Sequence, residues 1–357
     1  MKLIKSMSIY SICHFIVDFV SCIFVLGVAD NLCIDDTGEW SNWIYIAEII
    51  IYNFFAFAFQ VPMGYIIDKL KMYKYVGVIG FCLIGICYIV AKGNPIILAS
   101  LVGIGNGLFH LEGGVSAYNN SKGKAFLNGL FVAPGAFGIF FGTFFYSVLA
   151  STYIPIILIM VAILLLSFVQ KDKLEFVENE QENIEKNGNK YRIIDIIAIV
   201  LLIGISIVVR SIGGGAIKYS WKPANELFIG TIFVTCVVLG KMFGGLIADK
   251  IGLKKIVVSS LILACISLII GFNSPFFGCL GIFLFNIPMS ITLLLLEKCN
   301  TKRLATMVGS NTFFLFIGYL ICMIPNTINN YVVLITSIII AIISILLAFR
   351  QCVIRNA

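Results

Sequence analysis

Five ionisable side chains stand deep inside apolar stretches of the chain, and their types suit proton or anion chemistry. The first two are His14 and Asp18, and their spacing of four residues puts them on one face of a helix. If these stretches cross a bilayer, each charge costs at least about 2.5 kcal/mol, so each is a functional candidate by default. Both groups titrate, so the pair is suited to carrying a coupling proton. The alternative is a polar contact that joins two helices.

His110 and Glu112 form the second pair. At about 100° per residue their side chains point some 200° apart on a regular helix, so both cannot face one cavity. His110 lines up with Gly107 and Gly114 in a stripe that favours close helix packing. We therefore predict that Glu112 faces the cavity and carries a proton. His110 either assists proton transfer or has a structural role.

Arg210 is the fifth residue of this set, and it is followed by the triple glycine Gly213 to Gly215. An arginine stays charged, so it must face a partner or a wet cavity. Two roles fit: a counter-ion to Asp18 or Glu112, or a clamp for an anionic substrate. The glycines can unwind the helix and expose its backbone. The remaining acids and Lys241 in the apolar runs are expected to cap, pair or snorkel near the interfaces.

The composition shows what kind of elements must position these residues. Of 357 residues, 60% are hydrophobic and only 12% are charged, and the mean hydropathy is +1.04. Soluble domains are nearer 45–50% apolar and about 25% charged, so a soluble enzyme, a nucleic-acid binder and a disordered scaffold are disfavoured. About 30 residues per membrane helix and turn gives about twelve spans.

The apolar runs do number twelve, in two sets of six separated by a polar stretch. They cover about 6–28, 43–67, 75–91, 96–118, 125–150, 153–169, 193–217, 227–248, 256–272, 276–297, 303–324 and 331–349. We predict an all-α membrane protein of twelve transmembrane helices, in two six-helix bundles with pseudo-two-fold symmetry around a central cavity. Residues 1–169 form the N-terminal bundle, 170–192 a cytoplasmic linker and 193–357 the C-terminal bundle.

The basic residues predict the orientation. Of 25 Lys and Arg, twenty fall in gaps on one side and only Lys92, Lys218 and Lys222 on the other. By the positive-inside rule both termini are cytoplasmic, in a multi-pass plasma-membrane protein. The net charge of +7 is thus a topology signal and not a sign of nucleic-acid binding. An early signal-peptidase site at Gly27–Ala29 is a disfavoured alternative.

Eleven cysteines lie mostly inside apolar runs and form no C-x-x-C pattern, so we expect neither disulfides nor a metal site. Enzyme motifs such as H-E-x-x-H, G-x-S-x-G and the P-loop are absent from the sequence. We therefore expect no enzyme activity and no cofactor.

A short motif occurs once in each half. Gly64, Asp68 and Lys69 end the second run, and their counterparts 181 positions later (64 to 245), Gly245, Asp249 and Lys250, end the eighth. The second copy continues with Gly252 and Lys254. Gly allows two helix ends to approach closely, and Asp can accept hydrogen bonds from a neighbouring helix N-terminus. Lys71 stands where the second copy has Gly252. We predict a conformation-dependent latch between the halves.

This motif resembles the loop signature of the major facilitator superfamily, which lies between the second and third helices of each six-helix half. The combination of His14-x-x-x-Asp18, His110-x-Glu112 and Arg210 resembles the fosmidomycin-resistance branch of that superfamily, although Leu111 replaces the branch's usual Pro. The Gly/Pro-rich run 129–142 is similar to the fifth helix of antiporters. The resemblance implies a secondary transporter, driven in that branch by inward protons.

We therefore predict proton-coupled efflux, by antiport, of a small anionic or amphiphilic compound, with protons and the substrate as partners in a lipid-embedded monomer. Asp18 and Glu112 would exchange protons, His14 and His110 would assist, and Arg210 would bind substrate. Two alternatives stay open: an uptake symporter for a nutrient anion, and a membrane sensor that does not transport.

Overall fold

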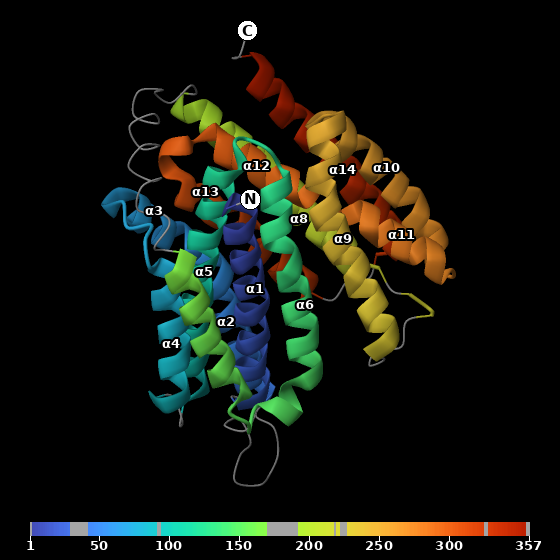
Figure 1. The fold of residues 1–357 in the computed structure, drawn as a ribbon. Helices are drawn as coiled ribbons and strands as arrows, with labels where there is room; N and C mark the ends of the chain where they lie inside the picture. The colour runs from blue at the N-terminus through green and yellow to red at the C-terminus, as the bar shows by residue number, and fades with distance from the viewer. Residues whose placement is uncertain are drawn as a thin grey trace.

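The computed structural model describes residues 2–28, 42–90, 94–169, 192–217, 219–221, 227–324 and 328–354. Over these residues the chain is a set of long helices joined by short turns, without a strand (Figure 1). The predicted linker at 170–192 lies outside the described residues except for Arg192, as do the first outer loop and the basic residues predicted for the outer side.

The first half contains helices that follow the predicted runs. Their bounds are α1 (Lys2–Ile23, continued by the π-helical turn Phe24–Val28), α2 (Asn42–Asn53, continued by Phe54–Ala58), α3 (Gln60–Leu70), α4 (Val76–Val90), α5 (Pro95–Ser121), α6 (Phe126–Leu149) and a further helix at Ile154–Val169. Because α2 and α3 are separated only by the π-helical turn, they form one span, Ile44–Leu70.

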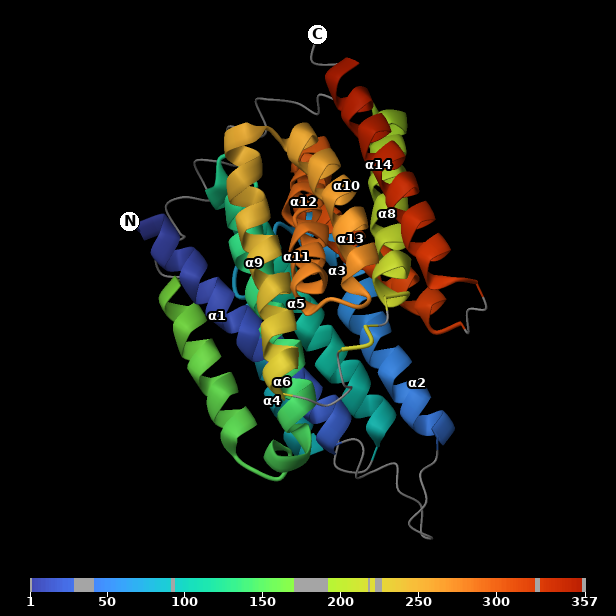
Figure 2. The ribbon, with the colours of Figure 1, turned by 90° about the vertical axis from the view of Figure 1, so that its right-hand side faces the viewer.

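The second half repeats this pattern. Its helices are α8 (Ile193–Gly215), α9 (Leu227–Ile251), α10 (Leu253–Gly271), α11 (Pro275–Asn286), α12 (Pro288–Cys299), α13 (Leu304–Cys322) and α14 (Asn330–Ile354). α11 and α12 form one span that is interrupted at Ile287, because the ring and the missing N–H of the following Pro288 break helical hydrogen bonding. In Figure 2, α8 and α14 lie side by side at one flank.

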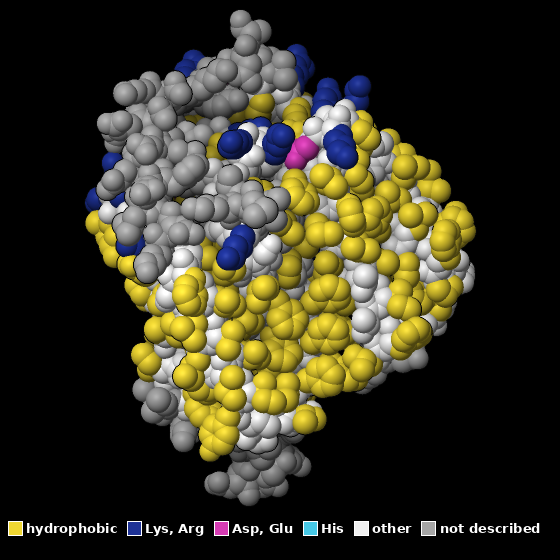
Figure 3. Space-filling view, in the orientation of Figure 1, with side chains coloured by type: hydrophobic (Ala, Val, Ile, Leu, Met, Phe, Trp, Pro, Cys, Tyr) yellow, Lys and Arg dark blue, Asp and Glu magenta, His cyan; other side chains and the backbone are white. Residues whose placement is uncertain are grey.

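Each of the twelve predicted runs contains a helix. Ten helices in the described residues are long and apolar enough to cross a membrane, and Val76–Tyr88 and Ile154–Val169 are shorter apolar helices. Large apolar side chains stay on the outside, for example Phe168, Phe228 and Phe276 at 67–71% exposure. Figure 3 shows this apolar surface over most of one face, with Lys and Arg gathered towards one end. The chain is thus a multi-pass membrane protein.

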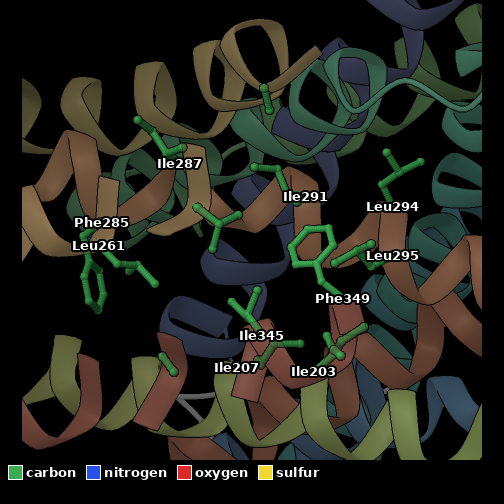
Figure 4. Packing of buried hydrophobic residues seen from close by; sticks show 14 of the residues in the cluster. Ile203, Ile207, Leu261, Phe285, Ile287, Ile291, Leu294, Leu295, Ile345 and Phe349 are labelled. Carbon is green, nitrogen blue, oxygen red and sulfur yellow. The ribbon is translucent and has the colours of Figure 1, made fainter. Parts of the chain in front are cut away.

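Buried apolar side chains form two main clusters that follow the two halves. One draws all its members from residues 7–169, and the other, seen in Figure 4, draws all but Ala125 from residues 196–349. A smaller third cluster mixes the halves: Met63, Ile67, Leu111 and Val115 pack with C-terminal residues such as Ala305 and Val308. Helices α3, α5 and α13 therefore meet where the halves join.

Candidate functional site

Glycines on α6 bring this helix against α1, where His14 and Asp18 lie. A Cβ on Gly138 would lie 2.5 Å from the Phe15 carbonyl oxygen, and one on Gly142 would lie 2.7 Å from that of Phe19. Only glycine permits such an approach of two backbones. The Gly/Pro-rich run of the sequence thus packs its glycine face onto α1, as the predicted tight packing requires.

His14, Asp18 and His110 meet in one buried cluster between α1 and α5. His14 Nε2 lies 3.3 Å from Asp18 Oδ2, His110 Nε2 lies 3.8 Å from Asp18 Oδ1, and the two Nε2 atoms are 2.8 Å apart. All three residues are buried, at 4–8% exposure. His14 and Asp18 share one face of α1, as their spacing predicts.

The contacts of the Nδ1 atoms indicate the tautomer of each histidine. His14 Nδ1 lies 2.7 Å from the Phe131 carbonyl oxygen, and His110 Nδ1 lies 2.9 Å from that of Asn106. Because a carbonyl only accepts, each Nδ1 carries the hydrogen and donates it. Two neutral rings would then present bare lone pairs to each other at 2.8 Å. A proton or another cation held between the Nε2 atoms would remove this conflict, and the Asp18 carboxylate would balance its charge.

Asn106 links the cluster to its surroundings. Its side-chain amide donates to Asp18 Oδ1 at 3.0 Å and to Ser21 Oγ at 3.2 Å, and the residue is fully buried. Asn106 lies one helical turn before His110 on α5, so it faces the same side of the helix. Its spacing from His110 was the sequence signal that could have identified it.

Glu112 lies in a different polar contact from the Asp18 cluster. It accepts a 2.5 Å hydrogen bond from the Tyr10 hydroxyl and a 2.7 Å hydrogen bond from the backbone N–H of Gly77, in the first turn of α4. A carboxylate at that place satisfies an otherwise unpaired donor and complements the helix dipole. The predicted angular separation of His110 and Glu112 explains why they have different partners. These contacts favour a capping role, and the proton-carrying role of Glu112 stays a prediction.

Substitution of Glu112 separates these two roles. Gln can still accept from the Gly77 N–H, so we expect Glu112→Gln to keep proton coupling and to cost less than about 1 kcal/mol of stability. Glu112→Ala leaves that N–H buried and unpaired, and should cost about 1–3 kcal/mol. Thermal unfolding of the purified variants and proton flux in liposomes are the measurements. A stable Glu112→Gln protein without coupling would establish Glu112 as a proton carrier instead.

Arg210 is buried on α8, and its described hydrogen-bond partner is a backbone group. Its Nη2 donates to the Phe285 carbonyl oxygen at 3.0 Å, and its guanidinium carbon lies 5.5 Å from the centre of the Phe285 ring. Within the described residues its Nε has no hydrogen-bond partner. An unmatched buried donor on a permanent cation is suited to an anionic ligand.

Lys241 on α9 is a further candidate. Sequence reasoning placed it near an interface, but its side chain is half-buried and lies within electrostatic range of Asp18, His110 and Arg210. The charge of Lys241 therefore interacts both with Asp18 in the N-terminal half and with Arg210 in the C-terminal half. The sequence could have indicated this interaction, because Lys241 lies well inside the eighth apolar run and not at its end.

The repeated Gly/Asp motif forms two contacts between the halves. Asp249, near the end of α9, accepts hydrogen bonds from the N–H groups of Ala125 (2.8 Å) and Phe126 (2.9 Å) at the start of α6. Asp68, near the end of α3, accepts from the N–H groups of Ala305 (3.0 Å) and Thr306 (2.8 Å) at the start of α13, and from the Thr306 hydroxyl (2.6 Å). Each Asp thus caps a helix of the other half, the contact that its residue type predicts.

The motif glycines allow these contacts. A Cβ on Gly64 would lie 2.5 Å from the Ala305 carbonyl oxygen, and one on Gly245 would lie 2.5 Å from that of Ala125. We call these two contacts the Asp68 junction and the Asp249 junction. The side chains of Lys69, Lys250 and Lys254 are exposed, so the junction contacts themselves come from the glycines and aspartates.

Both copies of the motif end at a residue with positive φ, although ψ differs, at 29° for Lys71 and 133° for Gly252. Lys71 has φ 55° and the matching Gly252 has φ 113°, both in the left-handed region. Tyr73, next to this turn, donates to Asp68 Oδ1 at 2.8 Å. Burial and the neighbouring Asp68 carboxylate raise the pKa of the Tyr73 hydroxyl well above its usual value, so it stays a donor. The first copy therefore forms its junction although its sequence departs from the motif.

We expect Lys71→Gly to stabilise the protein by about 0.5–1 kcal/mol, because glycine enters the left-handed region without a steric penalty. The apparent melting temperature in detergent measures this. A lower melting temperature would show that contacts of the Lys71 side chain stabilise the protein by more than its left-handed backbone conformation destabilises it.

A third contact between the halves was not foreseen. The Asn128 amide on α6 donates to Glu297 Oε2 on α12 at 2.5 Å, and both residues are fully buried. Glu297 was expected near an interface as a capping or pairing group, and it does pair. Its partner is 169 positions away, so no local pattern indicates it.

Comparison with known proteins supports the fold. No family model and no curated protein matches the sequence. Among solved structures, the chain is similar to a variant of the E. coli fucose:proton symporter FucP, with a TM-score of 0.64, 12% identity and 98% and 99% of the two chains covered. It is also similar to FucP, a major facilitator superfamily transporter, in the outward conformation, with a TM-score of 0.58, 13% identity and 93% and 98% coverage.

A third similar structure is a bacterial homologue of the iron transporter ferroportin in the outward-facing state, with a TM-score of 0.60, 12% identity and 98% and 99% coverage. At these identities the likeness concerns the fold. The protein has the fold of major facilitator superfamily transporters.

Proposed function

We propose that the protein is a proton-coupled secondary transporter of the major facilitator superfamily, with twelve spanning helices in two bundles around a central cavity. The observation that supports this proposal is the buried cluster of His14, Asp18 and His110, whose geometry suits one shared proton. A proton held between two imidazoles and a carboxylate is a simple coupling device, because its gain or loss changes the charge between α1 and α5. Asp18 and both histidines are the proton-coupling residues, and Glu112 is the alternative proton carrier that Glu112→Gln tests.

The Asp68 and Asp249 junctions support an alternating-access mechanism. Both join one half to the other by hydrogen bonds that a rigid-body separation would break. Both lie at turns with several Lys residues, which the positive-inside rule makes cytoplasmic. We therefore assign this conformation to the outward-facing state, in the plasma membrane with both termini cytoplasmic. The outward-facing neighbours agree with this assignment.

The substrate we propose is a small anionic or amphiphilic molecule, bound by Arg210 with Lys241 nearby. Lys241 and Arg210 lie within electrostatic range of each other, and a bound anionic substrate would reduce the repulsion between these two cations. The resemblance of the buried residues to the fosmidomycin-resistance branch favours efflux by proton antiport. Uptake by symport is the second candidate, because a fold neighbour is a fucose:proton symporter. We propose a monomeric transporter and not an enzyme or a sensor.

Reconstituted liposomes test this function. Purified protein is placed in vesicles that contain a pH-sensitive dye, and a panel of carboxylates, phosphonates, amphiphilic drugs and sugars including fucose is added. We expect at least one compound to evoke a proton flux that empty vesicles and vesicles with Asp18→Asn do not show. If compounds bind the protein but none evokes a flux of protons or compound, the sensor alternative is correct.

The direction of transport is measured in cells. Overexpression should lower the intracellular level of the active compound and increase resistance to it, whereas deletion should raise that level. Loss of growth on a single nutrient after deletion, with no change in resistance, would instead support uptake.

A further inference from the structure

The cluster of His14, Asp18 and His110 has the donor set of a transition-metal site. One ligand atom from each residue lies within 4.8 Å of the others. The two Nε2 atoms are 2.8 Å apart, His14 Nε2 lies 3.3 Å from Asp18 Oδ2, and His110 Nε2 lies 3.8 Å from the other carboxylate oxygen, Oδ1. Ligands about 2.0–2.1 Å from a metal ion in tetrahedral or octahedral geometry are about 2.9–3.4 Å apart. The separation of His14 Nε2 from Asp18 Oδ2 falls in that range, and that of the two Nε2 atoms lies just below it. Small side-chain adjustments would therefore bring a donor from each residue onto one ion.

The hydrogen bonds around the cluster are those that metal ligands need. Both Nδ1 atoms donate to backbone carbonyls, which leaves each Nε2 with a lone pair that points into the cluster. Metal-binding histidines are commonly held in this tautomer by such a carbonyl. The Asn106 amide orients Asp18 in the same way. Asn106 Oδ1, on a fully buried side chain, has no hydrogen-bond partner among the described residues.

We propose that His14, Asp18 and His110 bind a divalent transition-metal ion of the cobalt, nickel and zinc class, in place of the shared proton. Two imidazoles and one carboxylate suit these ions, whereas Ca²⁺ and Mg²⁺ prefer oxygen donors throughout. The sequence did not indicate this site, because His110 comes from α5 and follows Asp18 by 92 positions (18 to 110).

Gly135 on α6 closes one side of the cluster. A Cβ built there would overlap both His14 Nε2 and Asp18 Oδ2. The absent side chain therefore leaves the two donor atoms unobstructed. Gly135→Ala is a direct test, because it blocks the donor atoms while every ligand is kept.

The experiment is a titration of the purified full-length protein in detergent with Co²⁺, whose visible absorption reports its ligands. We expect one Co²⁺ per chain, displaced by Zn²⁺ and not by Mg²⁺. His14→Gln, His110→Gln and Gly135→Ala should each weaken binding by about 100-fold. Cys22→Ser, which removes the half-buried thiol one turn after Asp18, is the matched control and should bind as the wild type does.

Circular dichroism and gel filtration show whether each variant is folded. If His14→Gln is unfolded, the folded Gly135→Ala and His110→Gln proteins decide the question. Binding that survives in the folded ligand variants, or a wild type that binds no Co²⁺ at millimolar concentration, would overturn the metal site.

The inference concerns side chains of the proposed proton site, so the proton-flux assay is run with a chelator present. Proton coupling without metal binding would rule out the metal site and leave the proposed function standing. Metal binding without proton coupling would rule out the proposed proton coupling and leave the metal site standing.

Discussion

Asp18→Asn is expected to abolish proton-coupled transport while the protein still folds. The Asp18 carboxylate lies 3.3 and 3.8 Å from the two Nε2 atoms, where it would balance the proton that we propose His14 and His110 share. Removal of one partner of a buried ion pair costs about 3–5 kcal/mol, so the occupancy of the shared proton should fall by about 100-fold or more. Asn keeps the shape of the side chain and can still accept from Asn106, which preserves the packing of α1 on α5.

The measurement is the compound-evoked proton flux in liposomes, compared with compound binding to the same protein. We expect binding to persist while the flux falls to the level of empty vesicles. Asp195→Asn is the matched control, because Asp195 is a buried acid in the first turn of α8, away from the cluster. It should retain the flux. An Asp18→Asn protein with wild-type flux would rule out the cluster as the coupling site.

Gly64→Ala and Gly245→Ala are expected to open the junctions. In each case the new Cβ would lie 2.5 Å from a backbone carbonyl oxygen of the opposite half, and backbone cannot move aside as a side chain can. Overpacking of this kind costs about 1–3 kcal/mol, and relief comes when the two halves separate. This strain should shift the equilibrium between conformations by about 5- to 100-fold.

Alkylation of a cysteine introduced at Ala125 measures this shift, in a background without the native cysteines. Ala125 is fully buried in the Asp249 junction. We expect its alkylation to be about tenfold faster or more in Gly64→Ala, although Gly64 lies in the other junction, because rigid halves open both junctions together. Gly85→Ala is the control, since its Cβ would only contact Ile159 at 3.6 Å. Unchanged alkylation in Gly64→Ala would mean that the junctions open independently or not at all.

The sequence predicted the features that depend on local spacing. Twelve apolar runs correspond to helices because each run is long enough to form one, and His14 and Asp18 share a face because they are four apart. The motif aspartates cap helices of the other half because that is the use of an acid beside a helix N-terminus. Lys71 replaces the glycine of the motif, but the turn still forms, because a lysine can adopt a left-handed backbone conformation at a modest cost in stability.

Features that depend on contacts between distant helices could not be predicted. His110 and Glu112 were separated correctly by angle, but no pattern showed which one meets Asp18, and the structure pairs Asp18 with His110. Arg210 donates to the backbone carbonyl of Phe285, and such a partner cannot be recognised in the sequence because every residue has a backbone carbonyl. The link between Asn128 and Glu297 and the metal-like donor set likewise arise only when helices from different parts of the chain pack together.

Electron-spin distance measurement at varied pH most directly tests whether the cluster controls alternating access. Leu70 and Ile251 are equivalent exposed positions at the ends of α3 and α9, one on each half beside the junctions, so labels there report the separation of the halves. We expect two distance populations in the wild type whose ratio changes between acidic and neutral pH. In Asp18→Asn we expect that ratio to be independent of pH. A single distance in the wild type, or the same pH response in both proteins, would contradict proton control of the junctions by Asp18.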